Sequence, residues 1–358
     1  MTKKTAIVLF NLGGPDKPEA VRPFLFNLFN DPAIIGLPGP FRWLLAKFIS
    51  ARRAPVAREI YAHIGGKSPL LEQTNAQARA LEAALTGRNG SGAYRVFVCM
   101  RYWHPMSDET ARAVRTYSPD EIVLLPLYPQ YSTTTTGSSI KDWHRAAAKA
   151  GIDKPTRTIC CYPTDGGLIR AQADLVQAAI AKLAGEGTPG VTPKRTPRVL
   201  FSAHGLPKKV IDTGDPYQWQ VEQTVAAVVA ELGARGVGPF DPVVCYQSRV
   251  GPLEWIGPST EDELARAGKE GVAVAVVPIA FVSEHSETLV ELDIEYRHLA
   301  EKAGVPAYER VATVQVSRPF IEGLAGAVRV APRGPGHLEG SRICPDACGR
   351  CPMSEGTR

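Results

Sequence analysis

A histidine at the end of an apolar run is the first group in this sequence that could do chemistry. The run Arg198–Ser202 leads into Ala203, His204 and Gly205, so His204 stands where a strand would end and a glycine permits a tight turn. Near neutral pH a histidine can accept a proton or ligate a metal. A histidine hydrogen-bonded within the turn is the alternative, and position alone favours neither.

A stripe of glutamates follows another apolar run. Ser283 is placed to cap a helix, and on that helix Glu284, Glu287, Glu291 and Glu295 would fall at three- and four-residue spacing along one face. Such stripes are commonly solvated surfaces. Here the stripe begins at the C-terminal end of a strand, where α/β proteins bind ligands, so it favours a path for a divalent cation or for protons.

The cysteines near the C-terminus form the second chemical pattern. Cys344, Cys348 and Cys351 have the spacing C-x₃-C-x₂-C, which suits one metal centre. Three thiolates leave one ligand missing, and Cys161 or Cys160, at the end of a predicted strand, could supply it. Structural zinc and free thiols are the alternatives. With no export signal, the seven cysteines do not indicate a disulfide framework.

Aromatic, basic and hydroxyl side chains stand at further predicted strand ends. Arg101, Tyr102 and Trp103 follow one strand, residues 128–137 supply hydroxyls after another, and Trp255 adds an aromatic ring. Together they describe a cleft for a large planar ligand, with arginines able to bind carboxylates through two hydrogen bonds.

The elements that must position these groups alternate along the chain. Short apolar runs separated by stretches of helical period predict an α/β protein with parallel sheets. The predicted strands are 6–10, 95–100, 121–127, 156–161, 198–202, 243–246 and 271–279, and the predicted helices are 74–85, 108–116, 169–183, 219–232 and 260–267.

The strand motifs also repeat. Residues 8–14 resemble 199–205, 97–101 resemble 243–247, and 125–136 resemble 277–288, in the same order. This predicts two similar lobes. In the repeat His204 corresponds to Gly13 and Glu287 to Thr135, so both chemical groups belong to the second lobe.

Length and charge exclude several function classes. The 358 residues favour two lobes, and a dispersed net charge of +5 with no polybasic run argues against nucleic acid. The N-terminal apolar stretch reads as a buried strand, and no run is long enough to span a bilayer, so we expect a cytoplasmic protein. No G-x-G-x-x-G follows the first strand, which argues against a dehydrogenase.

Residues 34–53 form an apolar, aromatic and basic segment whose prolines are expected to break any long helix. It could pack as core. It could equally form an exposed lip that takes an apolar substrate from a membrane surface, giving peripheral membrane contact.

A set of motifs in order, covering about residues 6–325, resembles the ferrochelatase family. They are Asn11-Leu-Gly-Gly-Pro15, Tyr61-x-x-Ile-Gly-Gly-x-Ser-Pro69, Met100-Arg-Tyr102, the Pro-Leu-Tyr-Pro-Gln-Tyr-Ser beginning at Pro126, Ser202-Ala-His-Gly-Leu-Pro207, the Gln-Ser-x-Val-Gly-Pro beginning at Gln247, and Glu287-Thr-Leu-x-Glu-Leu-Asp-Ile-Glu-Tyr296. The resemblance implies two Rossmann-like lobes of chelatase type with a porphyrin cleft between them. It places the lobes at 1–155 and 156–310, a closing helix returning to the first lobe at 311–340, and a cysteine-rich tail at 341–358.

The same resemblance implies the reaction and its residues. Fe²⁺ would enter protoporphyrin IX to give protohaem, with His204 and Glu287 as the catalytic, metal-binding pair and Glu284 and Glu291 on the acidic path. The family's pocket falls on Leu12, Arg53, Tyr61, Ser68, Arg101, Tyr102 and Trp255, with Arg53 and Ser68 meeting a propionate. Coproporphyrin III as substrate, or a non-catalytic tetrapyrrole- or metal-binding protein, are the alternatives.

The tail resembles that of family members carrying a [2Fe–2S] cluster. The resemblance implies Cys344, Cys348 and Cys351 as ligands, with Cys161 or Cys160 completing the set. Animal members place the internal ligand where Ala171 stands here. Cluster-bearing relatives form homodimers.

Overall fold

The structure, a computed structural model, describes residues 3–86, 93–185, 196–249, 252–330, 334–337 and 342–353. It divides into two compact units. The first unit comprises Met1–Tyr162, Leu324–Ile343 and Pro352–Arg358, and the second comprises Pro163–Gly323 and Cys344–Cys351. Each unit contains one sheet in which every strand pair is parallel, so the prediction of an α/β fold with parallel sheets is confirmed.

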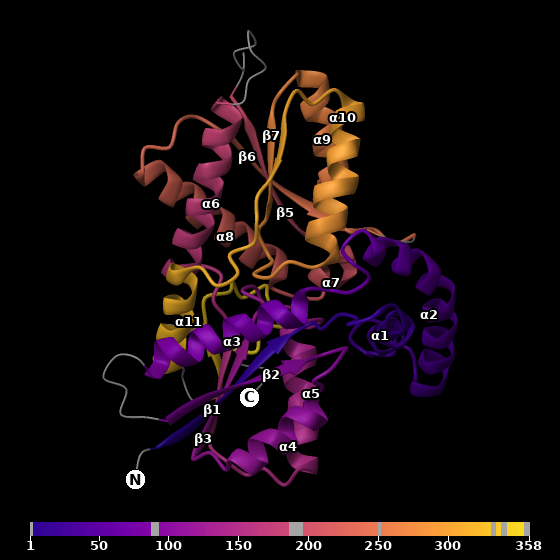
Figure 1. Cartoon of the computed structure of the whole chain (residues 1–358), viewed down its shortest axis with the longest axis vertical. Coiled ribbons are helices and arrows are strands. Elements are labelled where there is room, and N and C mark those ends of the chain that lie inside the picture. Colours follow the sequence, from indigo (N-terminus) through magenta and orange to yellow (C-terminus); the bar gives the residue numbers. More distant parts are fainter. Residues whose placement is uncertain are drawn as a thin grey trace. The chain divides into compact units, whose positions relative to one another are not determined.

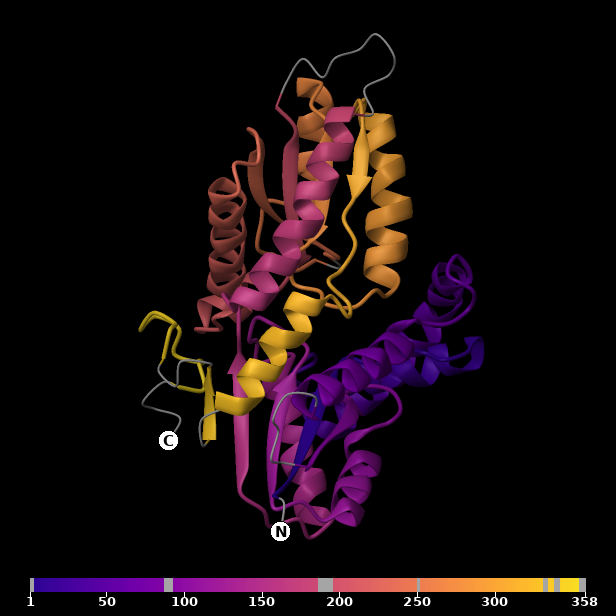
Figure 2. The ribbon, with the colours of Figure 1, turned by 60° about the vertical axis from the view of Figure 1, so that its left-hand side comes forward.

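The sheet of the first unit has the order β2-β1-β3-β4-β9. These strands are β1 (Lys4–Asn11), β2 (Ala93–Met100), β3 (Glu121–Pro126), β4 (Thr156–Cys161) and β9 (Gly334–His337). After its first residue β1 is buried throughout, as expected of a central strand covered on both faces. β9 pairs with β4 at the edge (Figure 2).

The helices of the first unit are η1 (Pro18–Ala20), α1 (Val21–Phe29), α2 (Gly39–Ala62), α3 (Leu70–Thr86), α4 (Ser107–Tyr117) and α5 (Thr136–Lys149). α3, α4 and α5 pack on the sheet, whereas α1 packs against α2. Ala6, Val8 and Phe10 of β1 form one core cluster with residues of α4 and α5. α3 packs beside β2 (Figure 1).

The sheet of the second unit has the order β6-β5-β7-β8. Its strands are β5 (Arg198–His204), β6 (Asp241–Gln247), β7 (Val274–Pro278) and β8 (Tyr308–Arg310). The order β6-β5-β7 repeats the order β2-β1-β3 of the first sheet. The three repeated strand motifs in the sequence therefore correspond to one topology present twice.

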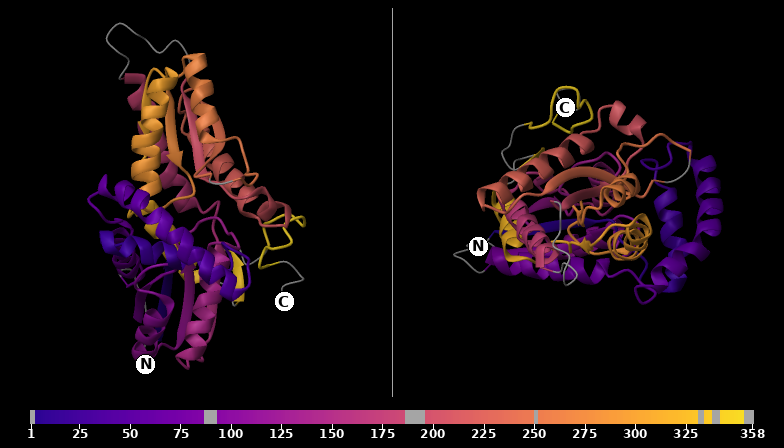
Figure 3. Two further views of the ribbon diagram at one scale, coloured as in Figure 1. Left: turned by 90° about the vertical axis from the view of Figure 1, so that its right-hand side faces the viewer. Right: turned by 90° about the horizontal axis from the view of Figure 1, so that it is seen from above.

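Alternate residues of β5 face different helices. Val199, Phe201 and Ala203 pack with α6 (Gly166–Gly185) and α8 (Tyr217–Ala234). Leu200 packs in a second cluster with α9 (Thr260–Glu270), the π-helix η2 (Glu287–Glu295) and α10 (Tyr296–Ala303). α9 and α10 lie side by side (Figure 3). The remaining helices are α7 (Lys208–Asp212) and α11 (Arg318–Val330).

Two local predictions were wrong. The helix carrying the glutamates does not begin after Ser283 as an α-helix: it is a π-helix that begins at Glu287, and Ser286 at its N-cap makes no side-chain capping bond. Residues 34–53 do contain much of a long helix, α2. Pro38 and Pro40 stand at its start, where a proline loses no helical hydrogen bond, and Pro55 lies inside it.

The unit boundaries also differ from the predicted lobes. The predicted second lobe begins at residue 156, the first residue of β4, but β4 pairs with β3 in the first sheet. The second unit continues to Gly323, within α11, because β8 and the chain after it pack with the second sheet. Residues 344–351 of the tail also belong to the second unit.

Candidate active site

β5 and β6 end together and bring His204 next to Gln247 in register. Gly205 follows, and its N–H donates to the Gln247 carbonyl at 2.8 Å. A Cβ at this position would lie 2.9 Å from that carbonyl oxygen. A glycine is therefore required here by the close approach of two backbones, and the turn holds His204 at the C-terminal end of the sheet.

The π-helix η2 presents Glu287 to this histidine. His204 Nδ1 lies 2.8 Å from Glu287 Oε2, and the two side chains keep 39% and 26% of their surface exposed. Burial alone would raise the pKa of Glu287, but charged His204 and its hydrogen bond lower that pKa to about 2. Burial opposes charging of the ring, yet the carboxylates of Glu287 and Glu291 raise the pKa of His204. Each member of the pair therefore favours the charged form of the other, an imidazolium beside a carboxylate.

Glu291, one turn further along, is held by four donors. It accepts hydrogen bonds from Ser248 N–H (2.8 Å), the Ser248 hydroxyl, the Gln247 amide (3.3 Å) and the Tyr296 hydroxyl (3.1 Å). Burial, followed by the charge of Glu287, raises the pKa of Glu291 to about 7. The Ser248 hydroxyl also lies 3.4 Å from Glu287 Oε2, so one hydroxyl links the two carboxylates.

The remaining glutamates of the predicted stripe have different surroundings. Glu284 is buried and paired with Arg310, whose Nη1 donates to both carboxylate oxygens at 2.9 and 3.1 Å. Glu295 is exposed. The structure therefore brings Glu287 and Glu291 to His204, while Glu284 binds an arginine and Glu295 faces solvent.

Four residues at or beside this site were not singled out from the sequence. Ser248 and Gln247 hold Glu291, Arg310 holds Glu284, and His285 is 8% exposed with its Nδ1 lacking a hydrogen-bond partner among the described residues. Burial lowers the pKa of His285. Only the Gln-Ser motif beginning at Gln247 gave a signal in the sequence.

Trp255 is the one predicted pocket residue that lies beside His204 in the same unit. A Cβ at Gly205 would be 3.4 Å from its ring atom Cε3, and it bridges to Pro207 through the backbone. Its buried Nε1 has no hydrogen-bond partner among the described residues.

The other predicted pocket residues lie in the first unit. Leu12, Tyr61 and Tyr102 pack in one cluster. The Tyr102 hydroxyl donates to buried Asp31 at 2.8 Å, and Arg101 contacts the same carboxylate at 2.8 Å. Arg101 and Tyr102 therefore share an internal ion-pair network.

The two residues expected to meet a propionate differ in exposure. Arg53 is exposed, and its guanidinium lies 5.8 Å from the ring centroid of Phe29. Ser68 is buried, where its N–H donates to the Pro15 carbonyl and its hydroxyl accepts from Leu70 N–H. Arg53 is thus accessible to an anionic ligand in this conformation, and Ser68 is enclosed.

The cysteine tail docks on the second unit. Arg350 N–H donates to the Gly214 carbonyl at 3.0 Å, and the Gln220 amide donates to Cys344 Sγ at 3.1 Å. Cys344 and Cys351 are buried and Cys348 is partly exposed. Among the residues that the structure describes, no three His, Cys, Asp or Glu side chains are gathered so as to hold a metal ion.

Cys160 and Cys161 lie at the end of β4 in the first unit. Their sulfur atoms are 3.4 Å apart, and both are buried beside Tyr131 and Ile343. Neither is therefore exposed as a free surface thiol.

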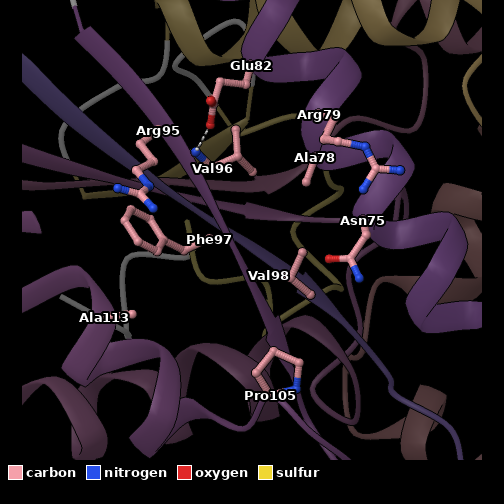
Figure 4. Close-up of a pocket in the computed structure, with 10 residues that line it drawn as sticks. All are labelled: Asn75, Ala78, Arg79, Glu82, Arg95, Val96, Phe97, Val98, Pro105 and Ala113. Atoms are coloured by element: carbon pink, nitrogen blue, oxygen red, sulfur yellow. Dashed lines mark hydrogen bonds between the residues drawn. The ribbon is translucent and has the colours of Figure 1, made fainter. Parts of the chain in front are cut away.

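A cavity of about 350 Å³ lies elsewhere, along the edge strand β2 (Figure 4). α3 contributes Arg79 and Glu82, and β2 contributes Arg95 and Val96. Glu82 accepts the Val96 N–H at 2.8 Å, which closes part of the strand edge. None of the predicted site residues lines this cavity.

α2 and the residues before it expose apolar side chains. Phe41, Leu44 and Phe48 keep 66%, 60% and 64% of their surface exposed, beside cationic residues such as Lys47. In the described part of the chain no helix has both the length and the apolar character needed to cross a bilayer.

Comparisons with known proteins identify the family of this chain. The family model described as Ferrochelatase matches residues 4–331. A ferrochelatase of Caulobacter vibrioides is 54% identical over 361 residues, and one of Phenylobacterium zucineum is 55% identical over 354, each covering 99% of both chains. The solved structure of SirB from Bacillus subtilis with Fe³⁺ has a TM-score of 0.50 at 11% identity, covering 92% of this chain and 95% of that one, which supports the fold alone. Two sheets of common topology and a full-length match at this identity establish that the chain belongs to the ferrochelatase family.

Proposed function

We propose that the porphyrin is protoporphyrin IX and that His204 and Glu287 are the residues at which Fe²⁺ replaces its two pyrrole protons. A ferrochelatase is a metal chelatase, classed as a lyase, that inserts iron into a porphyrin. The observation that carries the assignment is the 2.8 Å contact between His204 and Glu287 at the C-terminal ends of parallel strands.

The reaction releases two protons for each iron inserted, so the site needs acceptors as well as a metal ligand. Glu287 favours the protonated form of His204, so the pair can hold one proton between its two side chains. Once that proton leaves, the imidazole and the carboxylate can take pyrrole protons or bind the entering Fe²⁺.

Glu291 is suited to move protons away from the pair. A group with a pKa of about 7 gains and loses a proton readily at neutral pH, and the Ser248 hydroxyl connects it to Glu287. We therefore assign Glu291 to a proton path.

Replacement of His204 by alanine tests the catalytic role. We expect iron insertion to fall by about 100-fold or more while porphyrin still binds and quenches tryptophan fluorescence. Full activity in His204→Ala would contradict the assignment. Loss of porphyrin binding together with normal thermal stability would show that His204 binds the porphyrin and takes no part in catalysis.

The choice of porphyrin needs a direct comparison. Protoporphyrin IX carries two propionates and coproporphyrin III carries four, so the second substrate requires more cationic partners. Arg53 is the exposed arginine among the predicted pocket residues. We expect a higher kcat/KM for protoporphyrin IX when the two are assayed side by side, and the reverse order would overturn this choice.

We also propose that the tail cysteines Cys344, Cys348 and Cys351, with Cys161, bind a [2Fe–2S] cluster. Their spacing, the burial of two thiols and the hydrogen bond from Gln220 to Cys344 Sγ support this, since cluster sulfurs commonly accept such bonds. In the described conformation these cysteines are not gathered as a ligand set, so cluster binding requires the tail to rearrange.

Anaerobic purification tests the cluster. Visible charge-transfer absorption and acid-labile sulfide should be present in the parent chain and lost in Cys348→Ser and Cys161→Ser. They should remain in Cys160→Ser and in Cys245→Ser, a buried cysteine of β6. Zinc without sulfide would instead identify a structural zinc site.

We propose that the exposed apolar side chains of α2 contact a membrane surface from which the porphyrin is taken. Phe41, Leu44 and Phe48 lie near Lys47 and Arg52, a combination that favours anionic lipid surfaces. Flotation with anionic liposomes at low salt should carry the parent chain upward and leave Phe41→Asp/Phe48→Asp behind. Absence of lipid binding in the parent chain would exclude this contact.

Homodimer formation and a cytoplasmic location stay predictions. Sedimentation equilibrium of the full chain, with and without the cluster, measures homodimer formation.

A further inference from the structure

Side chains of neighbouring elements hold the π-helix that carries Glu287 and Glu291. π-helices are uncommon and usually short, because their i→i+5 bonds fit the backbone less well than α-helical bonds. η2 extends from Glu287 to Glu295, and its N-cap residue makes no side-chain bond. Its geometry must therefore be stabilised by neighbouring elements.

One guanidinium contacts both the segment before η2 and its later half. Arg310, at the end of β8, donates through Nη1 to both oxygens of Glu284, and its Nε lies 3.3 Å from Asp293 Oδ2. The side chain of Arg310 is 13% exposed and that of Glu284 is 6% exposed. Because water screens this contact poorly, the ion pair is strongly position-specific.

Other contacts bind the same two carboxylates. Thr288 Oγ1 donates to Glu284, and Thr313 N–H donates to it at 3.0 Å. Arg297 contacts Asp293 Oδ1 at 2.8 Å and also donates to the Tyr308 carbonyl at 2.9 Å. Two arginines therefore balance two carboxylates, and β8 and η2 are joined along the helix.

We propose that Arg310 is a positioning residue for iron insertion, and that Glu284 serves as its anchor rather than as a carrier of metal or protons. By holding residues 284 and 293, Arg310 fixes the part of η2 that places Glu287 against His204. This inference rests on the proposed role of Glu287.

A set of variants with one matched control tests it. Arg310→Met removes the charge and keeps the length of the side chain, whereas Arg310→Lys keeps the charge and loses the paired donors. The control is Arg198→Met. Arg198, 4% exposed, also bridges two carboxylates, Asp241 and Glu270, but at the opposite end of β5 from His204. The double variant Glu284→Gln/Arg310→Met removes both buried charges together.

Two readouts separate positioning from general stability. In Arg310→Met we expect kcat to fall at least about tenfold at a temperature where the chain is folded, with KM for porphyrin unchanged. The pKa of His204, followed by NMR and assigned with His204→Ala, should fall because Glu287 no longer raises it. Arg310→Lys should recover part of both properties, and the double variant should recover thermal stability but not kcat.

Three results would overturn the proposal. The first is Arg310→Met with the kcat and the His204 pKa of the parent chain. The second is full recovery of kcat in the double variant, because Arg310 would then only neutralise the charge of Glu284. A fall in kcat of equal size in Arg198→Met would also overturn it. Glu287→Gln with full activity would instead refute the proposed function, whatever Arg310 does.

Discussion

Ser248 donates two hydrogen bonds to the carboxylate of Glu291, from its backbone N–H and from its hydroxyl. Its backbone has a φ of 60°, which is unusual for a residue other than glycine. The serine is therefore kept in a costly backbone conformation in which both donors reach one carboxylate.

Ser248→Ala should shift the pH dependence of iron insertion. The hydroxyl lowers the pKa of Glu291, which burial and Glu287 raise to about 7, so its removal should raise that pKa further. The limb of the kcat profile that reports Glu291 should then move to higher pH. Ser248→Gly is the matched control for backbone strain, since it loses the same hydroxyl and relieves the positive φ. An unchanged pH profile of kcat in both variants would show that Ser248 takes no part in the proton path.

Glu287→Gln should lower both the kcat of iron insertion and the pKa of His204. We expect kcat to fall by about 100-fold or more. Glu287 raises the pKa of His204, so the pKa of this ring should fall in the variant. NMR titration of the histidine ring protons measures the second effect without reference to activity. A pKa equal to that of the parent would show that the 2.8 Å contact is not maintained in solution.

Glu291→Gln should alter the pH dependence of stability. An acid whose pKa is raised on folding, here from 4.5 to about 7, stabilises the folded chain at low pH, and this contribution is lost as pH rises through that window. A glutamine at position 291 does not titrate, so the variant does not lose stability as the pH rises through this range. Its melting temperature relative to the parent should therefore increase by a few degrees between pH 5 and pH 8. A difference that stays constant over this range would contradict the raised pKa.

Gly214→Ala should release the cysteine tail. Gly214 has a φ of +96°, and an added Cβ would lie 2.8 Å from the backbone nitrogen of Gly349, which cannot move as a side chain can. We expect a loss of about 1–2 kcal/mol of stability and faster alkylation of Cys344. Gly236→Ala is the control, because its φ is +68° with no atom within 4 Å of the added Cβ. Equal alkylation rates in the two variants would show that the Gly214 contact does not hold the tail.

The order of strands and helices could be predicted from the sequence better than the local geometry of the site. Buried apolar runs predicted the strands because a central parallel strand is apolar on both faces, as β1 is. β8 has three partly exposed residues and no apolar run, so it gave no signal. Arg310 at its end acts through Glu284, a contact that forms only when residues 284 and 310 meet in space.

The π-helix could not be predicted for a different reason. Glutamates at three- and four-residue spacing fit an α-helix, and intrinsic propensity does not distinguish the two helix types. Contacts from outside the helix, such as Arg310 with Glu284 and Tyr308 with the Leu292 carbonyl, form only in the folded chain and leave no local signal in the sequence. His204 was different, since its position at a strand end followed directly from the sequence.

The repeated strand order has a consequence for how the two halves can change. Gly13 is the counterpart of His204 in the first sheet, but its φ is +84° and a Cβ there would lie 2.9 Å from the backbone nitrogen of Trp103. A histidine at this position would need a different backbone, so no single substitution can transfer the reactive group to the other copy. The two sheets share a strand order, but the backbone leaves room for a histidine at this strand end in the second sheet alone.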